Sequence, residues 1–464
     1  MRARREPARS PSTQRGYSLG YPRSRLSGID PAAPADDAQG VREPTSLELI
    51  DVTGPRLLPS RSRTASSPPG RRPLSLLAGG TALAALLGTG LLSPAAADAA
   101  VAHHPHPVAA DAVVQHGIEA LAQEGFPGVL AAVSDGHGGG LDHVAGVGDL
   151  ATGAPVPVDG QVRIASNTKT FTATVVLQLV AEHRISLDRT VETYLPGVVR
   201  GPGGDGRQIT VRQLLQHTSG IPDYDDVLYP EWLASGFTRH YTGEELVAAG
   251  LSRPALAAPG AAFSYANTNF AIAGLIVERV TGHRIGDEIS TRVIHRLGLR
   301  DTYWPADGDR TIREPHPHDY LQDTAGGPWT DVTEMDPSMG WAAGQLVSTP
   351  RDLLTFFQAL VGGKLLPPAQ LREMETTVPA TDISLRNSDD RYGLGLASFA
   401  LSCGGRVWTH GGDLPGTHSR EAVTADGRAV SIVVTGDPAN PDPQDAHQFA
   451  DLEDAVDTAF CALK

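Results

Sequence analysis

Apolar residues recur with the period of an α-helix in two stretches, one near each end of the part of the chain that shows regular patterns. In the first stretch Asp111 is a suitable N-cap. Val114, Ile118 and Leu121 follow at helical spacing, and Gly125 ends the pattern. In the second, one helical stripe carries the apolar residues Phe449, Leu452, Val456, Phe460 and Leu463. We therefore predict an amphipathic helix at each end of the fold.

Five short segments between these helices have the apolar content and the flanking turn residues of β-strands. They are 129–134, 141–148, 406–410, 421–425 and 428–435. The last two flank Asp426-Gly427, a dipeptide typical of hairpins, in which we expect positive φ at both positions. Neighbouring segments joined by hairpins predict an antiparallel sheet.

This order of elements predicts an α/β fold of the α+β type. In it, a five-stranded antiparallel sheet is flanked by the N-terminal and C-terminal helices. The middle of the chain shows mainly helical patterns and loops rich in proline and glycine. We assign 111–464 to one domain, with a sheet part formed by 111–160 plus 390–464. Residues 161–389 are then a helical insertion, and a cleft is expected between the two parts.

The first hundred residues differ in composition from the rest. Residues 1–70 are rich in Arg, Pro and Ser without hydrophobic periodicity, which predicts a disordered extension. Residues 71–97 combine paired arginines, an apolar run and an Ala-x-Ala site, as in a cleaved secretory signal, and the paired arginines suggest the twin-arginine route. The alternative is a retained membrane anchor. Residues 98–110 read as a linker, so we expect a secreted protein.

Charge and cysteine content limit the classes of partner. Residues 1–97 carry 13 Lys and Arg against 7 Asp and Glu, whereas the remainder carries 25 against 46. An acidic body argues against nucleic acid as a partner. We infer no obligate protein partner and expect a monomer.

The two cysteines, Cys403 and Cys461, predict one disulfide in an exported protein, with two buried free thiols as the alternative.

Ser166-Asn167-Thr168-Lys169 precedes a strongly apolar helical stretch. A spacing of three residues is about one helical turn, so Ser166 and Lys169 are expected on one face. A lysine in a dry site loses its proton more easily and can activate a serine hydroxyl. Taken alone, the pair is more typical of a capping serine followed by a surface lysine.

Two further motifs add polar groups of the same chemistry. Tyr265-Ala266-Asn267 enters a second helical stretch, where a phenol can relay protons and an amide can hold a substrate carbonyl. His410, Gly411, Gly412 and Asp413 follow a strand, where glycines let a substrate lie against the backbone and a strand N–H can serve an oxyanion hole.

Together, Ser-x-x-Lys, Tyr-x-Asn and His-x-Gly resemble the three motifs of the penicillin-recognising serine hydrolases. The likeness is to the branch formed by class C β-lactamases and secreted D-alanyl-D-alanine carboxypeptidases. It covers residues 112–462, with the motifs in family order. The phrases 213–222, 392–396 and 401–404 also resemble the carboxypeptidases.

The resemblance implies a β-lactamase-like fold and a role for each residue. Ser166 would be acylated, with Lys169 or Tyr265 as the general base, an alternative that stays open. Asn267 would hold the substrate amide and His410 would complete the catalytic polar network. Gly411, Gly412 and Asp413 would bind substrate, and the backbone N–H groups of Ser166 and Asp413 would form the oxyanion hole. No metal or organic cofactor is implied.

The chain departs from the carboxypeptidases where they hold a substrate carboxylate with an arginine and two hydroxyls. Ala397, Gly411 and Asp413 stand at those positions, and Arg391 or Arg420 would have to substitute. Asp413 would add a like charge, or would pair with a substrate amine. We expect a D-alanyl-D-alanine carboxypeptidase or penicillin-binding protein of cell-wall metabolism. The alternatives are an esterase, a D-aminopeptidase or amidase, or a β-lactamase. A non-turnover β-lactam sensor or wall-binding module is less favoured.

Three residues near the motifs carry separate expectations. His217 in His-Thr-Ser-Gly is expected to order a loop rather than to react. Tyr229 and Met339 are predicted either to line the cleft or to belong to the core.

Overall fold

The computed structural model describes residues 108–137, 140–380, 383, 389–439 and 449–464. The predicted extension and signal segment lie outside these ranges. No helix in the described ranges has the length and apolar character needed to cross a membrane. Helix α1 (Val108–Gln123) begins three residues before Asp111, so the predicted linker ends earlier than the sequence indicated.

One antiparallel sheet organises the fold, with the strand order β10-β11-β12-β13-β15-β16-β1-β2-β3 and with β14 paired to β15. The strands are β1 (Gly128–Asp135), β2 (Gly140–Asp149), β3 (Ala154–Pro155), β10 (Val378–Pro379), β11 (Arg391–Tyr392), β12 (Ala397–Ala400), β13 (Arg406–Thr409), β14 (Gly411–Leu414), β15 (Thr417–Val423) and β16 (Arg428–Thr435). The fold class is confirmed, but the prediction of five strands is wrong. The additional strands are two to four residues long, too short for an alternating pattern to reveal them.

The hairpin of β15 and β16 is confirmed, although its turn differs from the prediction. Only Gly427 has positive φ, +89°, and the N–H of Gly427 donates to the carbonyl of Thr424 at 2.9 Å. The loop of four residues, 424–427, is therefore built around an ordinary turn that ends in a left-handed glycine, rather than around a two-residue turn.

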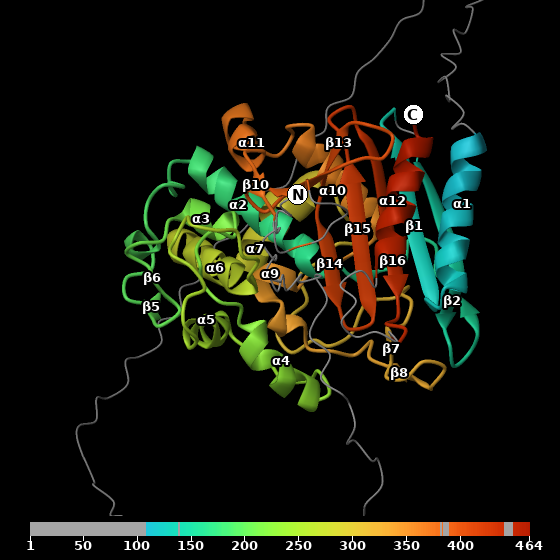
Figure 1. Cartoon of the computed structure of the whole chain (residues 1–464), viewed down its shortest axis with the longest axis horizontal. Helices are drawn as coiled ribbons and strands as arrows, with labels where there is room; N and C mark the ends of the chain where they lie inside the picture. The colour runs from blue at the N-terminus through green and yellow to red at the C-terminus, as the bar shows by residue number, and fades with distance from the viewer. Residues whose placement is uncertain (1–107, 138–139, 381–382, 384–388, 440–448) are drawn as a thin grey trace, which may run out of the picture. The chain divides into compact units, whose positions relative to one another are not determined.

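Strand β1 shows why the sheet has two covered faces. Val129, Ala131 and Val133 belong to a core shared with α1 and α12 (Ala450–Ala462), whereas Leu130 and Ala132 belong to the core of the helical part. Alternate residues of a strand point to opposite faces, so a strand covered on both sides is apolar throughout. Figure 1 shows α1 and α12 side by side next to β1, β2 and β16.

The opposite face packs against α10 (Pro350–Val361), and the core on this side continues into the remaining helices. These helices are α2 (Thr168–Ala181), α3 (Val211–Leu215), α4 (Asp225–Ala234), α5 (Gly243–Leu251), α6 (Asn267–Thr281), α7 (Ile285–Ile289), α8 (His295–Leu297), α9 (Trp341–Gly344) and α11 (Pro368–Met374). Short elements complete the described chain: β4 (Val162–Arg163) with β9 (Val347–Ser348), β5 (Arg200–Gly201) with β6 (Gly204–Asp205), β7 (Tyr320–Gln322) with β8 (Trp329–Asp331), and the single turns η1 (Ala165–Asn167), η2 (Val191–Thr193), η3 (Ser290–Ile294) and η4 (Pro337–Met339).

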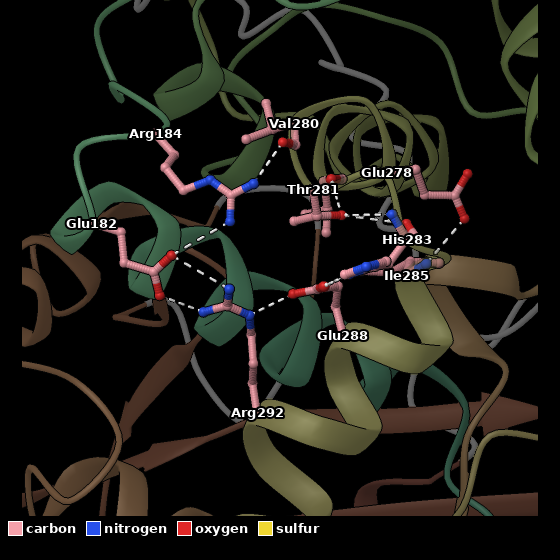
Figure 2. A network of polar contacts seen from close by, with 10 residues as sticks. Glu182, Arg184, Glu278, Val280, Thr281, His283, Ile285, Glu288 and Arg292 are labelled. Carbon is pink, nitrogen blue, oxygen red and sulfur yellow. Dashed lines mark hydrogen bonds and ion pairs between the residues drawn. The ribbon is translucent and has the colours of Figure 1, made fainter.

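Helix α2 is the centre of the helical part. Its residues from Thr168 to Leu179 are all buried, and its apolar and polar residues are not separated into an inner and an outer stripe. Its C-terminal end is fixed by the polar network in Figure 2, where Arg292 lies between Glu182 and Glu288 with N–O distances of 2.5 Å to each. That end lies about 20 Å along the helix from Lys169, so the network is remote from the catalytic motifs.

Candidate active site

The Ser-x-x-Lys motif forms the junction between η1 and α2. Ala165 has φ +43°, a left-handed conformation that costs a non-glycine residue about 1–2 kcal/mol. Ser166 follows it and is half-buried, whereas Ala165 and Asn167 are buried. The strained turn therefore presents the serine side chain to the neighbouring cavity, which Ala165 also lines.

Lys169 is fully buried and its Nζ makes three hydrogen bonds. It donates to Ser166 Oγ at 2.8 Å, to Asn267 Oδ1 at 2.6 Å and to the carbonyl of Ala343 at 2.9 Å. Burial lowers the pKa of Lys169 to about 7, against the opposing effect of Asp223, Asp225 and Asp413. The predicted pairing of serine and lysine is present, and the amine is close to half neutral at pH 7.

Asn267 connects Lys169 to two carboxylates that the sequence analysis missed. Its Nδ2 donates to Asp223 Oδ2 at 3.3 Å and to Asp225 Oδ2 at 2.8 Å. Burial raises the pKa of Asp223 to about 6, while burial and the charge of Asp223 raise that of Asp225 well above its usual value. Both N–H groups of Asn267 are thus engaged, so a substrate amide has to compete for them. The signal was the acidic run that follows Gly220-Ile221-Pro222.

Tyr265 stands over Lys169, whose Nζ lies 5.0 Å from the centre of the phenol ring. Burial raises the pKa of Tyr265 well above 10, and the interaction of its hydroxyl with Ser166 offsets only part of that rise. The phenol therefore keeps its proton while Lys169 can lose one. This difference favours Lys169 as the group that accepts a proton from Ser166.

His217 holds Tyr265 in place, as the expectation of an ordering role requires. The two rings lie 4.3 Å apart between centres, and His217 Nδ1 accepts hydrogen bonds from the N–H of Ala266 and from Asn269 Nδ2, both at 3.2 Å. Burial lowers the pKa of His217 well below its usual value, so the ring is neutral.

His410 is buried, and both of its ring nitrogens have partners. Its Nε2 is 2.9 Å from the hydroxyl of Tyr392, and its Nδ1 is 2.6 Å from the carbonyl of Gly411. Burial lowers the pKa of His410 to about 3, so the ring is neutral and both nitrogens are engaged. His410 therefore contacts Tyr392, whose ring lies 6.2 Å from that of Tyr265, while its expected place in the catalytic polar network stays a prediction.

Strand β14 lies against η1, which brings the third motif to the serine. A Cβ on Gly412 would lie 2.2 Å from the carbonyl oxygen of Ile164, so only glycine permits this approach. Ser166 and Asp413 line the same small cavity, about 10 Å³ in volume. This is the arrangement expected if the backbone N–H groups of these two residues face one oxyanion.

The side chain of Asp413 points to the other face of the sheet. Because Gly412 faces η1, the neighbouring Asp413 faces the layer of α12. Its Oδ1 lies 2.8 Å from His418 Nδ1 and 2.9 Å from Arg420 Nη1. The Asp413 carboxylate is already paired with two basic side chains, so the expectation that it repels a substrate carboxylate or pairs with a substrate amine is wrong.

The two arginines considered as substitutes for the carboxypeptidase arginine are also occupied. Arg391 donates to the hydroxyl and the carbonyl of Thr377 at 2.7 and 3.0 Å, and Arg420 is held by Asp413. Ala397 is buried in the core beneath α1 and α12. In the described part of the chain, no arginine lines the cavity.

Other groups complete the description of the site. Met339 and Tyr224 line the cavity, whereas Tyr229 packs against Trp232 in the core. A larger cavity of about 510 Å³, with Gln178 and Arg292 in its wall, lies at the remote end of α2 and contains none of the motif residues. Among the described residues, no group of three or more His, Cys, Asp or Glu side chains is arranged to hold a metal ion.

The disulfide is confirmed. Cys403 and Cys461 are bonded, with 5.9 Å between their Cα atoms, and join the turn after β12 to α12.

A family model and several solved structures are similar to this chain. A family model described as Beta-lactamase matches residues 88–455. Among solved structures, a D-stereospecific amidohydrolase from Streptomyces sp. is 40% identical, with a TM-score of 0.65 over 73% of this chain and 98% of that one. D-amino acid amidase from Ochrobactrum anthropi SV3, in complex with L-phenylalanine amide, is 26% identical. Its TM-score is 0.66, and the match covers 76% of this chain and 98% of the amidase.

Curated relatives match over shorter segments. Protein flp of Staphylococcus aureus (strain MW2) is 33% identical over 143 residues, which are 30% of this chain and 27% of flp. Penicillin-binding protein 4 of Amycolatopsis lactamdurans is 32% identical over 163 residues, which are 34% of this chain and 40% of that protein. The matches therefore span well under half the length of these two relatives.

Proposed function

The chain belongs to the Beta-lactamase family of serine hydrolases, and we propose that it hydrolyses amide or ester bonds through an acyl-enzyme on Ser166. One observation carries this proposal: a fully buried lysine whose Nζ lies 2.8 Å from the serine hydroxyl. A serine hydroxyl becomes nucleophilic when a positioned base removes its proton, and a buried amine is available at neutral pH.

The reaction follows from the positions of these groups. Neutral Lys169 accepts the hydroxyl proton while Ser166 Oγ attacks the carbonyl carbon of the substrate. The carbonyl oxygen becomes an oxyanion, which the backbone N–H groups of Ser166 and Asp413 bind. The bond to the amine or alcohol then breaks, and the leaving group takes the proton back from Lys169 by way of Tyr265. Water attacks the acyl-serine in the same manner, releasing a carboxylic acid and restoring Ser166.

We further propose that the substrate is a D-aminoacyl amide or ester with a free amine rather than a peptide with a free C-terminal carboxylate. Lys169 is joined through Asn267 to the carboxyl groups of Asp223 and Asp225, and in the described chain no arginine lines the cavity. A negative site attracts an ammonium group and repels a carboxylate. The similarity to proteins named D-stereospecific amidohydrolase and D-amino acid amidase supports the same choice.

The expected D-alanyl-D-alanine carboxypeptidase activity stays a prediction, as does export by a cleaved signal. A panel of four substrates tests the choice: D-alanine amide, an N-acylated D-alanyl-D-alanine peptide, p-nitrophenyl butyrate and a chromogenic cephalosporin. We expect the highest kcat/KM for the D-alanine amide and a much lower value for L-alanine amide. Turnover of the dipeptide-ended substrate alone would overturn the amidase proposal. Turnover that persists in Ser166→Ala would overturn the acyl-enzyme itself.

A further inference from the structure

Strand β15 holds both elements of the proposed oxyanion hole, one on each of its faces. Its residues alternate, so His418 and Arg420 point to the layer of α12 while Ser419 and Glu421 point to the side of η1. Register pairs Asp413 with His418 and Gly411 with Arg420, which sets β14 directly beside this strand. The two faces therefore contact two different parts of the site.

On the inner face, β15 contacts the residue that follows the nucleophile. Asn167 Nδ2 donates to Ser419 Oγ at 2.8 Å, and both residues are buried. The carboxyl group of Glu421 also interacts with Asn167, and it accepts a hydrogen bond from Ser431 Oγ at 3.3 Å. These contacts fix η1, and with it the backbone N–H of Ser166, relative to β15.

On the outer face, β15 contacts the residue that supplies the second backbone donor. The Asp413 carboxylate lies 2.8 Å from His418 Nδ1 and 2.9 Å from Arg420 Nη1, and all three residues are buried. His418 Nε2 contacts Asp437, and the His418 ring lies 3.9 Å from that of Phe449 on the α12 side. A carboxylate held by an imidazolium and a guanidinium cannot rotate without breaking charge-assisted bonds.

We infer that His418 and Arg420 are positioning residues for the proposed reaction: with Ser419 they make β15 the spacer that sets the distance between the two oxyanion donors. The inference rests on the proposed function. It assigns a role to the Asp413 side chain, which is paired with His418 and Arg420, and to a buried charge cluster that takes no part in the chemistry itself. A displacement of one donor by about 1 Å costs on the order of a hundredfold in rate.

This cluster also predicts an alkaline limit to activity. Burial alone would lower the pKa of His418, but Asp437 and Asp413 raise it to about 9. Further charged groups near His418 and its partner Arg420 include Asp319, Glu453 and Glu421. When His418 loses its proton, Asp413 keeps only Arg420, and the hold on β14 weakens. The turnover number is therefore expected to fall as pH rises through about 9.

The first test uses Asp413→Asn and a matched control in the network of Figure 2. Glu288 is also a buried carboxylate between a histidine and an arginine, 2.7 Å from His283 Nδ1 and 2.5 Å from Arg292 Nε, but it lies in α7, away from the serine. We expect Asp413→Asn to lower kcat for p-nitrophenyl butyrate about 10- to 100-fold with KM nearly unchanged. Glu288→Gln should lower thermal stability and leave kcat as it is. Equal effects of both variants on kcat, or none for Asp413→Asn, would overturn the inference.

The second test applies if Asp413→Asn does not fold. His418→Gln keeps hydrogen-bonding capacity and removes the titrating group, so its kcat should lose the decline near pH 9 that the wild-type enzyme shows. A variant profile that still declines at that pH contradicts the role of His418. Labelling of Ser166 by a fluorophosphonate is measured in every variant. If it is absent from the wild-type enzyme, the proposed function fails. If it is present in the wild-type enzyme and the pH profiles of the two proteins coincide, only the positioning role fails.

Discussion

Asp223 and Asp225 raise the pH at which Lys169 loses its proton, and replacing both with asparagine tests this effect. Each carboxylate contacts Asn267, which contacts Lys169, with hydrogen bonds of 2.6 Å on one side and 2.8–3.3 Å on the other. Adding the width of the Asn267 amide group to the two shorter hydrogen bonds gives a distance of at most about 8 Å between Lys169 Nζ and the Asp225 carboxylate. Asparagine keeps the oxygen that accepts from Asn267 and removes only the charge.

The magnitude follows from Coulomb's law. One unit charge at about 8 Å stabilises the ammonium by about 2 kcal/mol at an effective dielectric constant of about 20. This corresponds to about 1.5 pH units. Since burial holds the two carboxyl groups near one shared charge, the double variant removes about that amount. The pKa of Lys169 should then fall from about 7 to between about 5 and 6.

The assay is the pH dependence of kcat/KM for p-nitrophenyl butyrate, which has no titrating amine. The neutral amine is the active form, so kcat/KM rises as pH passes the pKa of Lys169 in the free enzyme. We expect the rise to move to lower pH in the double variant. It should move less in Asp225→Asn alone, because Asp223 then ionises more easily.

Asp226→Asn is the matched control. Asp226 adjoins the pair in sequence, but it is partly exposed and bonded to Arg253 at 2.9 Å, so its removal should leave the profile in place. A double variant whose profile stays at the wild-type pH, or moves upward, would refute the reasoning.

Three further predictions follow from other contacts. Gly412→Ala should lower kcat by at least about 100-fold, because its Cβ would meet the carbonyl of Ile164 at 2.2 Å and move β14 away from η1; circular dichroism checks that the fold is kept. Replacing Cys403 and Cys461 by serine opens a loop of 58 residues and should reduce the free energy of unfolding in urea by about 4 kcal/mol; a loss below about 1 kcal/mol would contradict this. His410→Gln should reduce kcat but leave the rise of kcat/KM near pH 7 at the same pH, because His410 is neutral there. A rise that moves to another pH in this variant would mean that His410 is charged in the wild-type enzyme.

Local spacing explains what the sequence could predict. Ser166 and Lys169 are one helical turn apart, so the helix alone brings their side chains together, and the structure has them at 2.8 Å. The terminal helices follow from periodicity within single segments, and the hairpin of β15 and β16 follows from the Asp-Gly dipeptide between two strand-like segments. The disulfide followed from the count of two cysteines in a chain expected to be exported.

Contacts between distant segments were beyond local patterns. Asp223 and Asp225 reach the site only because the loop after Gly220 folds against α6, and Tyr392 reaches His410 from another strand. The direction of the Asp413 side chain depends on the parity of β14. Because β14 begins with two glycines, it has no apolar pattern that would show which residues face which side of the sheet.

The central claim is that Ser166 is the nucleophile, and peptide mass spectrometry after treatment with a fluorophosphonate tests it most directly. We predict one equivalent of adduct on the peptide that contains Ser166, much slower labelling in Lys169→Met, and none in Ser166→Ala. An adduct on another residue, or equal labelling of Ser166→Ala, would contradict the account.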